Sequence, residues 1–311
     1  MCEMPMRKVV IVIIGLAFFA TVPGCAQPPV ADSDRIRIVA SFYPVANFAR
    51  QVAGDRAEVA TVIPSGLEPH DYEPTARDLA LIYDSPIFIY SGAGLEPWAE
   101  KIRPELEARG IHVLRLSDVV ELLSGVSGEV VREANQSDPH IWLDPVLAQR
   151  QVELIRDALV SLDPSQADDY QRSAADFLTK LKSLDLAFAE GLSDCKDHTV
   201  LLSHAAFQYL AKRYGFRTLS VGGFSEEQEP SPKDFAGLID SAKRLGLHFI
   251  FFERRSNPRL AETLAAEIGG ETLDLVHIDG GFSAEESADP NLYFDQMRAN
   301  LEQLRKAMEC K

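Results

Sequence analysis

The 311-residue sequence is short of basic residues, because 31 lysines and arginines stand against 47 aspartates and glutamates and leave a formal net charge of −16. A nucleic-acid binder displaces counterions from phosphates with a basic face. The chain has no run of lysine or arginine and no aromatic residues interleaved with basic ones. These absences argue against nucleic acid as a partner, whereas an acidic surface tolerates cations.

One long hydrophobic run is present, at the N-terminus. Arg7 and Lys8 precede "VVIVIIGLAFFATV", which is short for a membrane span and typical of a signal peptide, predicted over residues 1–24. "VPGC" resembles the cleavage box of bacterial lipoproteins, so we expect an exported chain that is lipidated on Cys25 and tethered by residues 25–34 at the periplasmic or extracellular face of a membrane. Ordinary cleavage to a soluble secreted protein and an uncleaved anchor helix are the alternatives.

Cysteine is scarce, and past the signal only Cys195 and Cys310 remain. An even pair in an exported protein predicts one disulfide. Closing so long a loop would stabilise the fold by roughly 4 to 5 kcal/mol in the chain-entropy model. Two separate free thiols are the alternative.

Short β-branched or apolar runs alternate with helical stretches in two sets. The expected strands are 35–44, 57–64, 86–92 and 112–118 in the first set, and 198–204, 217–224, 248–253 and 271–279 in the second. The expected helices are 75–85, 96–110, 205–215, 231–246 and 257–270, the last two closed by glycine. This alternation predicts an α/β fold of two lobes, each a mainly parallel sheet flanked by helices.

A long helical segment separates the two sets, with Asp163 as its expected N-cap and Pro164 at its first position. Apolar residues recur every three or four positions and predict one buried stripe, formed by Ala174, Phe177, Leu181, Leu184 and Phe188. The segment is interpreted as a rigid spine, against the alternative of an ordinary crossover helix. The predicted organisation is an N-terminal lobe over 35–162, a linker helix over 163–191 and a C-terminal lobe over 192–311.

A parallel sheet binds its ligands at the carboxyl ends of its strands. Three histidines lie directly next to expected strands or helices and are candidates for such a site. His70 follows a strand in "SGLEPHDYEP", and His204 ends a strand and is expected to open a helix. His140 lies in "SDPHIWLDP", where Pro139 and Pro145 restrict the backbone. Each histidine alone is a weak signal, but together they predict a metal site.

A carboxylate at the end of the last expected strand is the predicted fourth ligand. Asp279 precedes the flexible Gly280 and Gly281, and His277 shares its strand face two residues earlier. Asp279 is preferred because it lies nearer the strand end, while His277 could support a ligand from behind and Glu253 is another carboxylate within reach. The remaining histidines begin strands at the opposite end and are interpreted as structural: His112, His198 and His248.

Five motifs then identify a family in order and spacing: "EPHDYEPTARDL", "DPHIWLDP", "SHAAFQYLAKRYGF", "EPSPKDFAGLID" and "DPNLYFDQMRANL". Over nearly its whole length the chain resembles the metal-binding lipoprotein components of bacterial ABC importers for zinc and manganese. The resemblance implies that His70 and His140 from the N-terminal lobe, and His204 and Asp279 from the C-terminal lobe, are the metal ligands. It also implies that the spine limits lobe motion, so that metal release depends on loop rearrangement.

The expected function is the capture of a divalent metal outside the cytoplasm and its delivery, by a monomer, to the membrane subunit of an ABC permease. Three neutral imidazoles and one carboxylate suit Zn2+ in a tetrahedral site. Mn2+ or dual specificity is the alternative, because "LLSGVSGEVVREANQSD" has no histidine where many zinc-specific relatives carry a histidine-rich loop.

Two other classes of function compete with this hypothesis. A secreted zinc hydrolase could use Glu68 or Glu253 as a general base, but the chain has no HExxH motif and four protein ligands would close the site. We therefore expect that the protein is not an enzyme. A surface adhesin stabilised by the metal is the other rival, and loss of metal import on deletion of the protein would argue against it.

Overall fold

The computed structural model describes residues 35–124, 137–220, 224, 231–252 and 258–311. The predicted signal peptide, the tether with Cys25, and Glu253 lie outside the described residues, as does most of the stretch without histidine. Among the helices that are described, none combines the length and the apolar character needed to cross a membrane.

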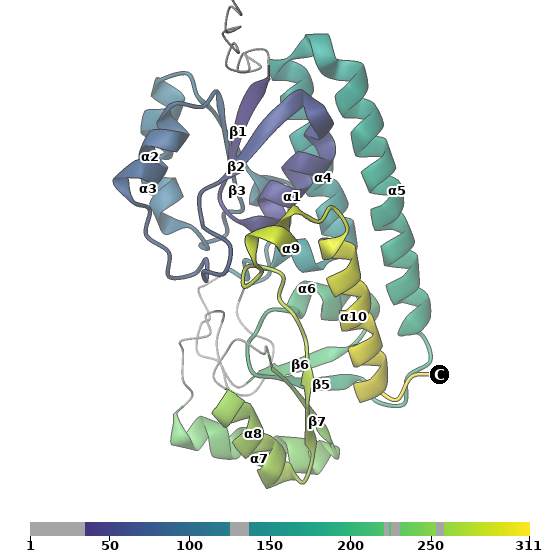
Figure 1. The fold of residues 1–311 in the computed structure, drawn as a ribbon. Helices are drawn as coiled ribbons and strands as arrows, with labels where there is room; N and C mark the ends of the chain where they lie inside the picture. The colour runs from purple at the N-terminus through teal and green to yellow at the C-terminus, as the bar shows by residue number, and fades with distance from the viewer. Residues whose placement is uncertain (1–34, 125–136, 221–223, 225–230, 253–257) are drawn as a thin grey trace, which may run out of the picture. The chain divides into compact units, whose positions relative to one another are not determined.

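Two four-stranded sheets, both entirely parallel, form the framework (Figure 1). The first sheet has the order β2-β1-β3-β4 and the second β6-β5-β7-β8. The strands are β1 (Ile36–Ala40), β2 (Ala57–Thr61), β3 (Ile87–Tyr90), β4 (His112–Arg115), β5 (Thr199–Leu202), β6 (Arg217–Ser220), β7 (Phe249–Phe252) and β8 (Glu271–Asp274). The predicted fold class is confirmed, and the two sheets have the same strand order.

The helices begin and end close to the residues that local signals indicate. They are α1 (Tyr43–Ala53), α2 (Ala76–Tyr83), α3 (Pro97–Ala108), α4 (Pro145–Leu162), α5 (Ala167–Gly191), α6 (Gln208–Tyr214), α7 (Pro232–Leu245), α8 (Pro258–Ile268), α9 (Ala284–Ala288) and α10 (Leu292–Ala307). Thr75 caps α2 in a reciprocal pair with Asp78. Gly246 and Gly269 follow α7 and α8 with φ of 68°, so the predicted glycine ends are confirmed.

Each sheet is covered on its outer face by two helices of its own. In the first sheet, Val39 and Phe88 pack with side chains of α2 and α3, among them Trp98. In the second sheet, Leu201 and Ile250 pack with side chains of α7 and α8. Central strands of such sheets are mostly apolar because both of their faces are buried, as the fully buried strands β3 and β5 illustrate.

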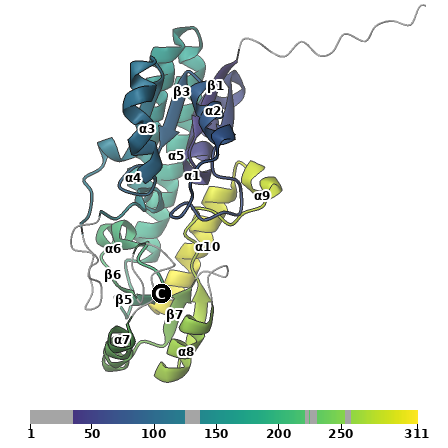
Figure 2. The same ribbon diagram turned by 90° about the vertical axis from the view of Figure 1, so that its left-hand side faces the viewer.

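The inner faces of both sheets pack against one continuous layer of side chains, here called the shared apolar layer. It takes buried residues from β1, α4, α5, α6 and α10, for example Ile38, Ile155, Leu181, Leu210 and Leu301. Helix α5 contacts α1, α4 and α10 (Figures 1 and 2). The two sheets therefore share a core instead of holding two separate ones.

Helix α5 carries the predicted stripe: Ala174, Phe177, Leu181, Leu184 and Phe188 are all buried. With 25 residues it is about 37 Å long. The helical segment begins at Pro164 with Asp163 at the N-cap, as predicted, and its first turn, Pro164–Gln166, is a 3-10 turn that leads into α5. The Asp163 carboxylate makes no capping hydrogen bond, and it accepts hydrogen bonds from the hydroxyls of Ser165 (2.6 Å) and Tyr170 (3.2 Å).

Cys195 and Cys310 are joined by a disulfide in the structure, across 115 residues of sequence. The bond links the chain just after α5 to the chain just after α10. Backbone hydrogen bonds support it, among them the one from the Asp197 N–H to the Met308 carbonyl (3.0 Å).

The shared apolar layer predicts different effects for two leucines of α5. Leu181 is fully buried, whereas Leu186 is 59% exposed. We expect Leu181→Ala to lower the free energy of unfolding by about 2 to 5 kcal/mol through the cavity it leaves. The matched variant Leu186→Ala should change it by less than about 0.5 kcal/mol. Denaturant unfolding followed by circular dichroism measures both, and equal losses would contradict the spine.

Candidate metal centre

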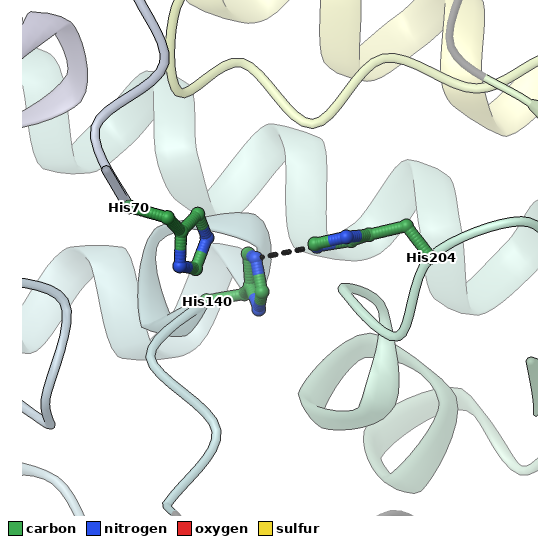
Figure 3. Close-up of side chains that lie close together, drawn as sticks. All are labelled: His70, His140 and His204. Atoms are coloured by element: carbon green, nitrogen blue, oxygen red, sulfur yellow. Dashed lines mark hydrogen bonds between the residues drawn. The ribbon is translucent and has the colours of Figure 1, made fainter. Parts of the chain in front are cut away.

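Three histidines from three separate segments lie close together (Figure 3). His70 lies between β2 and α2, His140 directly before the 3-10 turn Ile141–Leu143 that leads into α4, and His204 two residues after β5. One ring nitrogen of each lies within 4.8 Å of the others, and the Nε2 atoms of His140 and His204 are 3.0 Å apart. Two nitrogens on one tetrahedral zinc ion lie about 3.3 Å apart, so small shifts would let these rings share an ion.

The ring of His140 is oriented by Asp138. Oδ1 of Asp138 accepts hydrogen bonds from the backbone N–H (2.9 Å) and from Nδ1 (2.8 Å) of His140. Both residues are fully buried. With its proton on Nδ1, the imidazole keeps the Nε2 lone pair directed at His204, which is the arrangement that metal-binding histidines use.

The segment around His140 is also fixed by hydrogen bonds that the sequence did not indicate. The Tyr209 hydroxyl donates to the Asp138 carbonyl (2.8 Å), and Arg213 donates to the Asp144 carboxylate (2.6 Å). Trp142 Nε1 donates to the His277 carbonyl (2.7 Å). These partners lie 71, 69 and 135 residues away, so no local pattern could have revealed them.

Burial sets the protonation of the site. His140 is fully buried, His204 is 2% exposed, and the His70 side chain is 9% exposed. Burial and the neighbouring imidazoles lower the pKa of His70 and of His204 well below its usual value. Burial raises the pKa of Asp138 well above its usual value, against the hydrogen bond from the His140 N–H. Neutral imidazoles have free lone pairs, as metal binding requires.

Some nitrogens of the site make no hydrogen bond to any described residue. These are Nε2 of His70 and Nδ1 of His204, both buried. Buried polar atoms are nearly always hydrogen-bonded in native proteins, so each exception calls for an explanation. A metal ion bound at the His70 nitrogen would supply the missing partner there.

The predicted strand through His277 and Asp279 is wrong, because β8 ends at Asp274. Asn300 of α10 hydrogen-bonds the N–H (2.9 Å) and the carbonyl (2.8 Å) of Val276, where a neighbouring strand would have paired. Ile278 then takes a positive φ of 62°. His277 and Asp279 thus lie in an irregular segment, and strand alternation does not relate them.

Both residues nevertheless reach the histidines. The ring centroid of His277 is 4.5 Å from that of His204 and 6.4 Å from that of His140. Asp279, 4% exposed, joins Glu68 and His70 in a second group whose ligand atoms lie within 4.8 Å of one another. His70 therefore belongs to both groups, and the second group includes Glu68, which the sequence had suggested only as a possible general base.

The prediction that His204 opens a helix is wrong. Its carbonyl accepts the Ala206 N–H (3.1 Å) in a turn, and α6 begins only at Gln208.

The remaining histidines lie outside the site. His112, His198 and His248 are exposed and lie at the amino ends of β4, β5 and β7, away from the site.

Comparisons with known proteins agree with each other. The family described as zinc-uptake complex component A, periplasmic, matches residues 38–307. The zinc-binding lipoprotein AdcA of Streptococcus pneumoniae is 34% identical over an alignment that covers 98% of this chain and 62% of that protein, so the chain spans about three fifths of its length. The high-affinity zinc uptake system protein ZnuA of Bacillus subtilis is 33% identical, with 95% of this chain and 96% of that protein covered.

Solved structures of related proteins have the same fold as this chain. The laminin-binding protein Lmb of Streptococcus agalactiae, described as bifunctional with adhesin and metal transporting activity, has a TM-score of 0.78 at 31% identity, covering 88% of this chain and 99% of that one. Zn(II)-bound AdcA of Streptococcus pneumoniae has a TM-score of 0.77 at 35% identity, covering 89% of this chain and 58% of that one.

The lowered pKa values of His70 and His204 predict how the metal-free protein responds to acid. Below about pH 6.5 the unfolded chain binds protons that the folded chain does not, so the free energy of unfolding should fall as pH drops from 7 to 5. Each histidine contributes at most about 1.4 kcal/mol per pH unit in that window.

His204→Gln should flatten this dependence, while His248→Gln, at an exposed histidine, should leave it unchanged. Urea unfolding of metal-free protein at several pH values measures the slopes. Identical slopes in the wild type and in His204→Gln would show that burial does not keep this imidazole neutral.

Proposed function

Since the chain belongs to the family of zinc-uptake complex component A, periplasmic, we propose that it captures a divalent transition metal, above all zinc, and delivers it to the membrane subunit of an ABC permease. The observation that carries this proposal is the meeting of His70, His140 and His204 in a buried site. The names of the relatives AdcA and ZnuA, a zinc-binding lipoprotein and a zinc uptake protein, support zinc as the cargo.

In this proposal the ion is held by His70, His140, His204 and Asp279. The N-terminal lobe, 35–162, supplies the first two ligands and the C-terminal lobe, 192–311, the others, with 163–191 as the linker. Three nitrogen donors and one oxygen donor favour zinc, whereas Mn2+ prefers more oxygen ligands. A manganese or dual zinc/manganese carrier is the alternative for the cargo.

The family is a component of uptake complexes and not a family of enzymes. We propose that the chain acts as a monomer outside the cytoplasm, without a catalytic role. The description of AdcA as a lipoprotein supports Cys25 as the lipidated residue that anchors the mature chain to the membrane.

The ligand assignment predicts that single histidines differ sharply in their effect on zinc affinity. His140→Ala and His204→Ala should each weaken zinc binding by more than the roughly 10- to 100-fold that is typical of residues behind a ligand. His112→Ala and His248→Ala, at exposed histidines, should leave the affinity unchanged. Titration against a chromophoric zinc chelator measures all four, and equal affinities would refute the site.

The same variants test transport. A strain that lacks the gene should grow poorly when zinc is chelated and should recover with excess zinc. The wild-type gene and His112→Ala should restore growth, whereas His140→Ala should not. Normal growth of the deletion strain under chelation, in a strain with no second zinc importer, would contradict the proposed function.

A metal-stabilised adhesin is the second candidate, and it is supported by the structural similarity to Lmb, a protein described as having both adhesin and metal transporting activity. An adhesin that uses metal only for its fold would leave zinc-limited growth unaffected. Its variants would instead lose attachment to the host ligand in parallel with their loss of stability.

The fourth ligand gives a separate prediction. Asp279→Ala should weaken zinc binding and let water take the vacated coordination position, while His277→Ala should change affinity by no more than about 10-fold. Absorption of the Co2+-substituted protein reports the coordination of each folded variant. If His277→Ala proves the more damaging, the ligand set is all-histidine and Asp279 is misassigned.

A further inference from the structure

A second group of residues with metal-ligating side chains lies beside the three histidines. Glu68, His70 and Asp279 each offer one ligand atom, and these atoms lie within 4.8 Å of one another. Since His70 also belongs to the three-histidine group, one ring serves two adjacent positions. The two positions differ in chemistry, because one has two carboxylates and the other has three neutral imidazoles.

The two positions also differ in access to solvent. The Glu68 side chain is 34% exposed, whereas His140 is fully buried and His204 is 2% exposed. The shared His70 side chain lies between these extremes at 9%, and its Nε2 is 3.9 Å from Oε1 of Glu68 and makes no hydrogen bond to any described residue. Glu68 thus lies on the solvent side of the histidines, whereas Asp279 is buried beside them at 4% exposure.

Close contacts hold together the two segments that carry Glu68 and Asp279. A Cβ atom on Gly280 would lie 2.5 Å from the Leu67 carbonyl oxygen, so the chain next to Asp279 runs directly against the chain next to Glu68. The hydroxyl of Ser65 donates to that of Ser287 (3.2 Å). The two carboxylates therefore approach each other through a fixed backbone arrangement.

We propose that Glu68, His70 and Asp279 form an outer position that a hydrated divalent cation occupies first, before it passes to the three histidines. This inference rests on the proposed function of metal capture. Two carboxylates can balance the charge of the ion while it loses water, which the neutral imidazoles cannot do. His70 and Asp279 stay bound throughout, and His140 and His204 then replace Glu68 and the remaining water.

Stopped-flow mixing of metal-free protein with zinc tests the outer position, with tryptophan fluorescence as the signal because Trp142 lies beside His140 (ring centroids 5.2 Å apart). Glu68→Gln keeps the shape and removes the charge, and it should slow zinc association by about tenfold or more. Release of zinc to excess EDTA should slow as well, because an ion that enters through the outer position also leaves through it. The equilibrium affinity should therefore change little.

Glu73→Gln is the matched control, since Glu73 is an exposed acid of the same segment outside both ligand sets. It should leave the association rate at the wild-type value. Wild-type kinetics in Glu68→Gln, or equal slowing in both variants, would overturn the outer position. So would a loss of equilibrium affinity in Glu68→Gln as large as in His140→Ala, because Glu68 would then be a ligand of the buried position.

A second measurement uses the His204→Ala background, where the histidine set is broken. We expect weak zinc binding to remain, and to be lost in the double variant His204→Ala, Glu68→Gln. Equal residual binding in the single and double variants would overturn the outer position. Failure of the proposed function would look different, because the wild type itself would then bind no zinc.

Discussion

The shared apolar layer sets the distance between the histidines. His70 follows β2 and His140 follows β4 of the first sheet, and His204 follows β5 of the second, so their separation depends on how the sheets are held. Moving the sheets apart would expose side chains that pack as one cluster. Exposing apolar surface costs a free energy of about 25 cal/mol per Å². The fold itself therefore brings the rings together, which reduces the ordering that metal binding requires.

Burial keeps two of the histidines neutral, and hydrogen bonding orients the third. Desolvation lowers the pKa of His70 and His204, so that protons compete weakly with a metal ion near neutral pH. Orientation of His140 comes instead from Asp138, whose own backbone carbonyl is held by Tyr209. A change at Tyr209 would thus reach the site through two hydrogen bonds without touching a ligand.

Local patterns predicted most of the fold, and a contact between distant residues accounts for the wrong end of the last strand. The alternation of strands and helices, the stripe of α5 and the position of histidines after strands required only local reasoning. The end of β8 depends on Asn300, which is 24 residues away from Val276. The second ligand set could not be predicted, because Glu68 and Asp279 come from opposite lobes and only the folded chain brings them together.

Two kinds of contact of different strength join the lobes, and the proposed release of a metal ion would use the weaker one. The shared apolar layer is large and close-packed, so opening it exposes many side chains at once. The segment that carries Glu68 and His70 contacts the C-terminal lobe through the close approach of Leu67 to Gly280 and through the Ser65–Ser287 hydrogen bond, which is exposed to solvent. Such a bond contributes only about 0.5 to 1.5 kcal/mol. Withdrawal of this segment would remove the proposed ligand His70 from the histidine set while both sheets stay in place, as the loop rearrangement implied by the family resemblance requires.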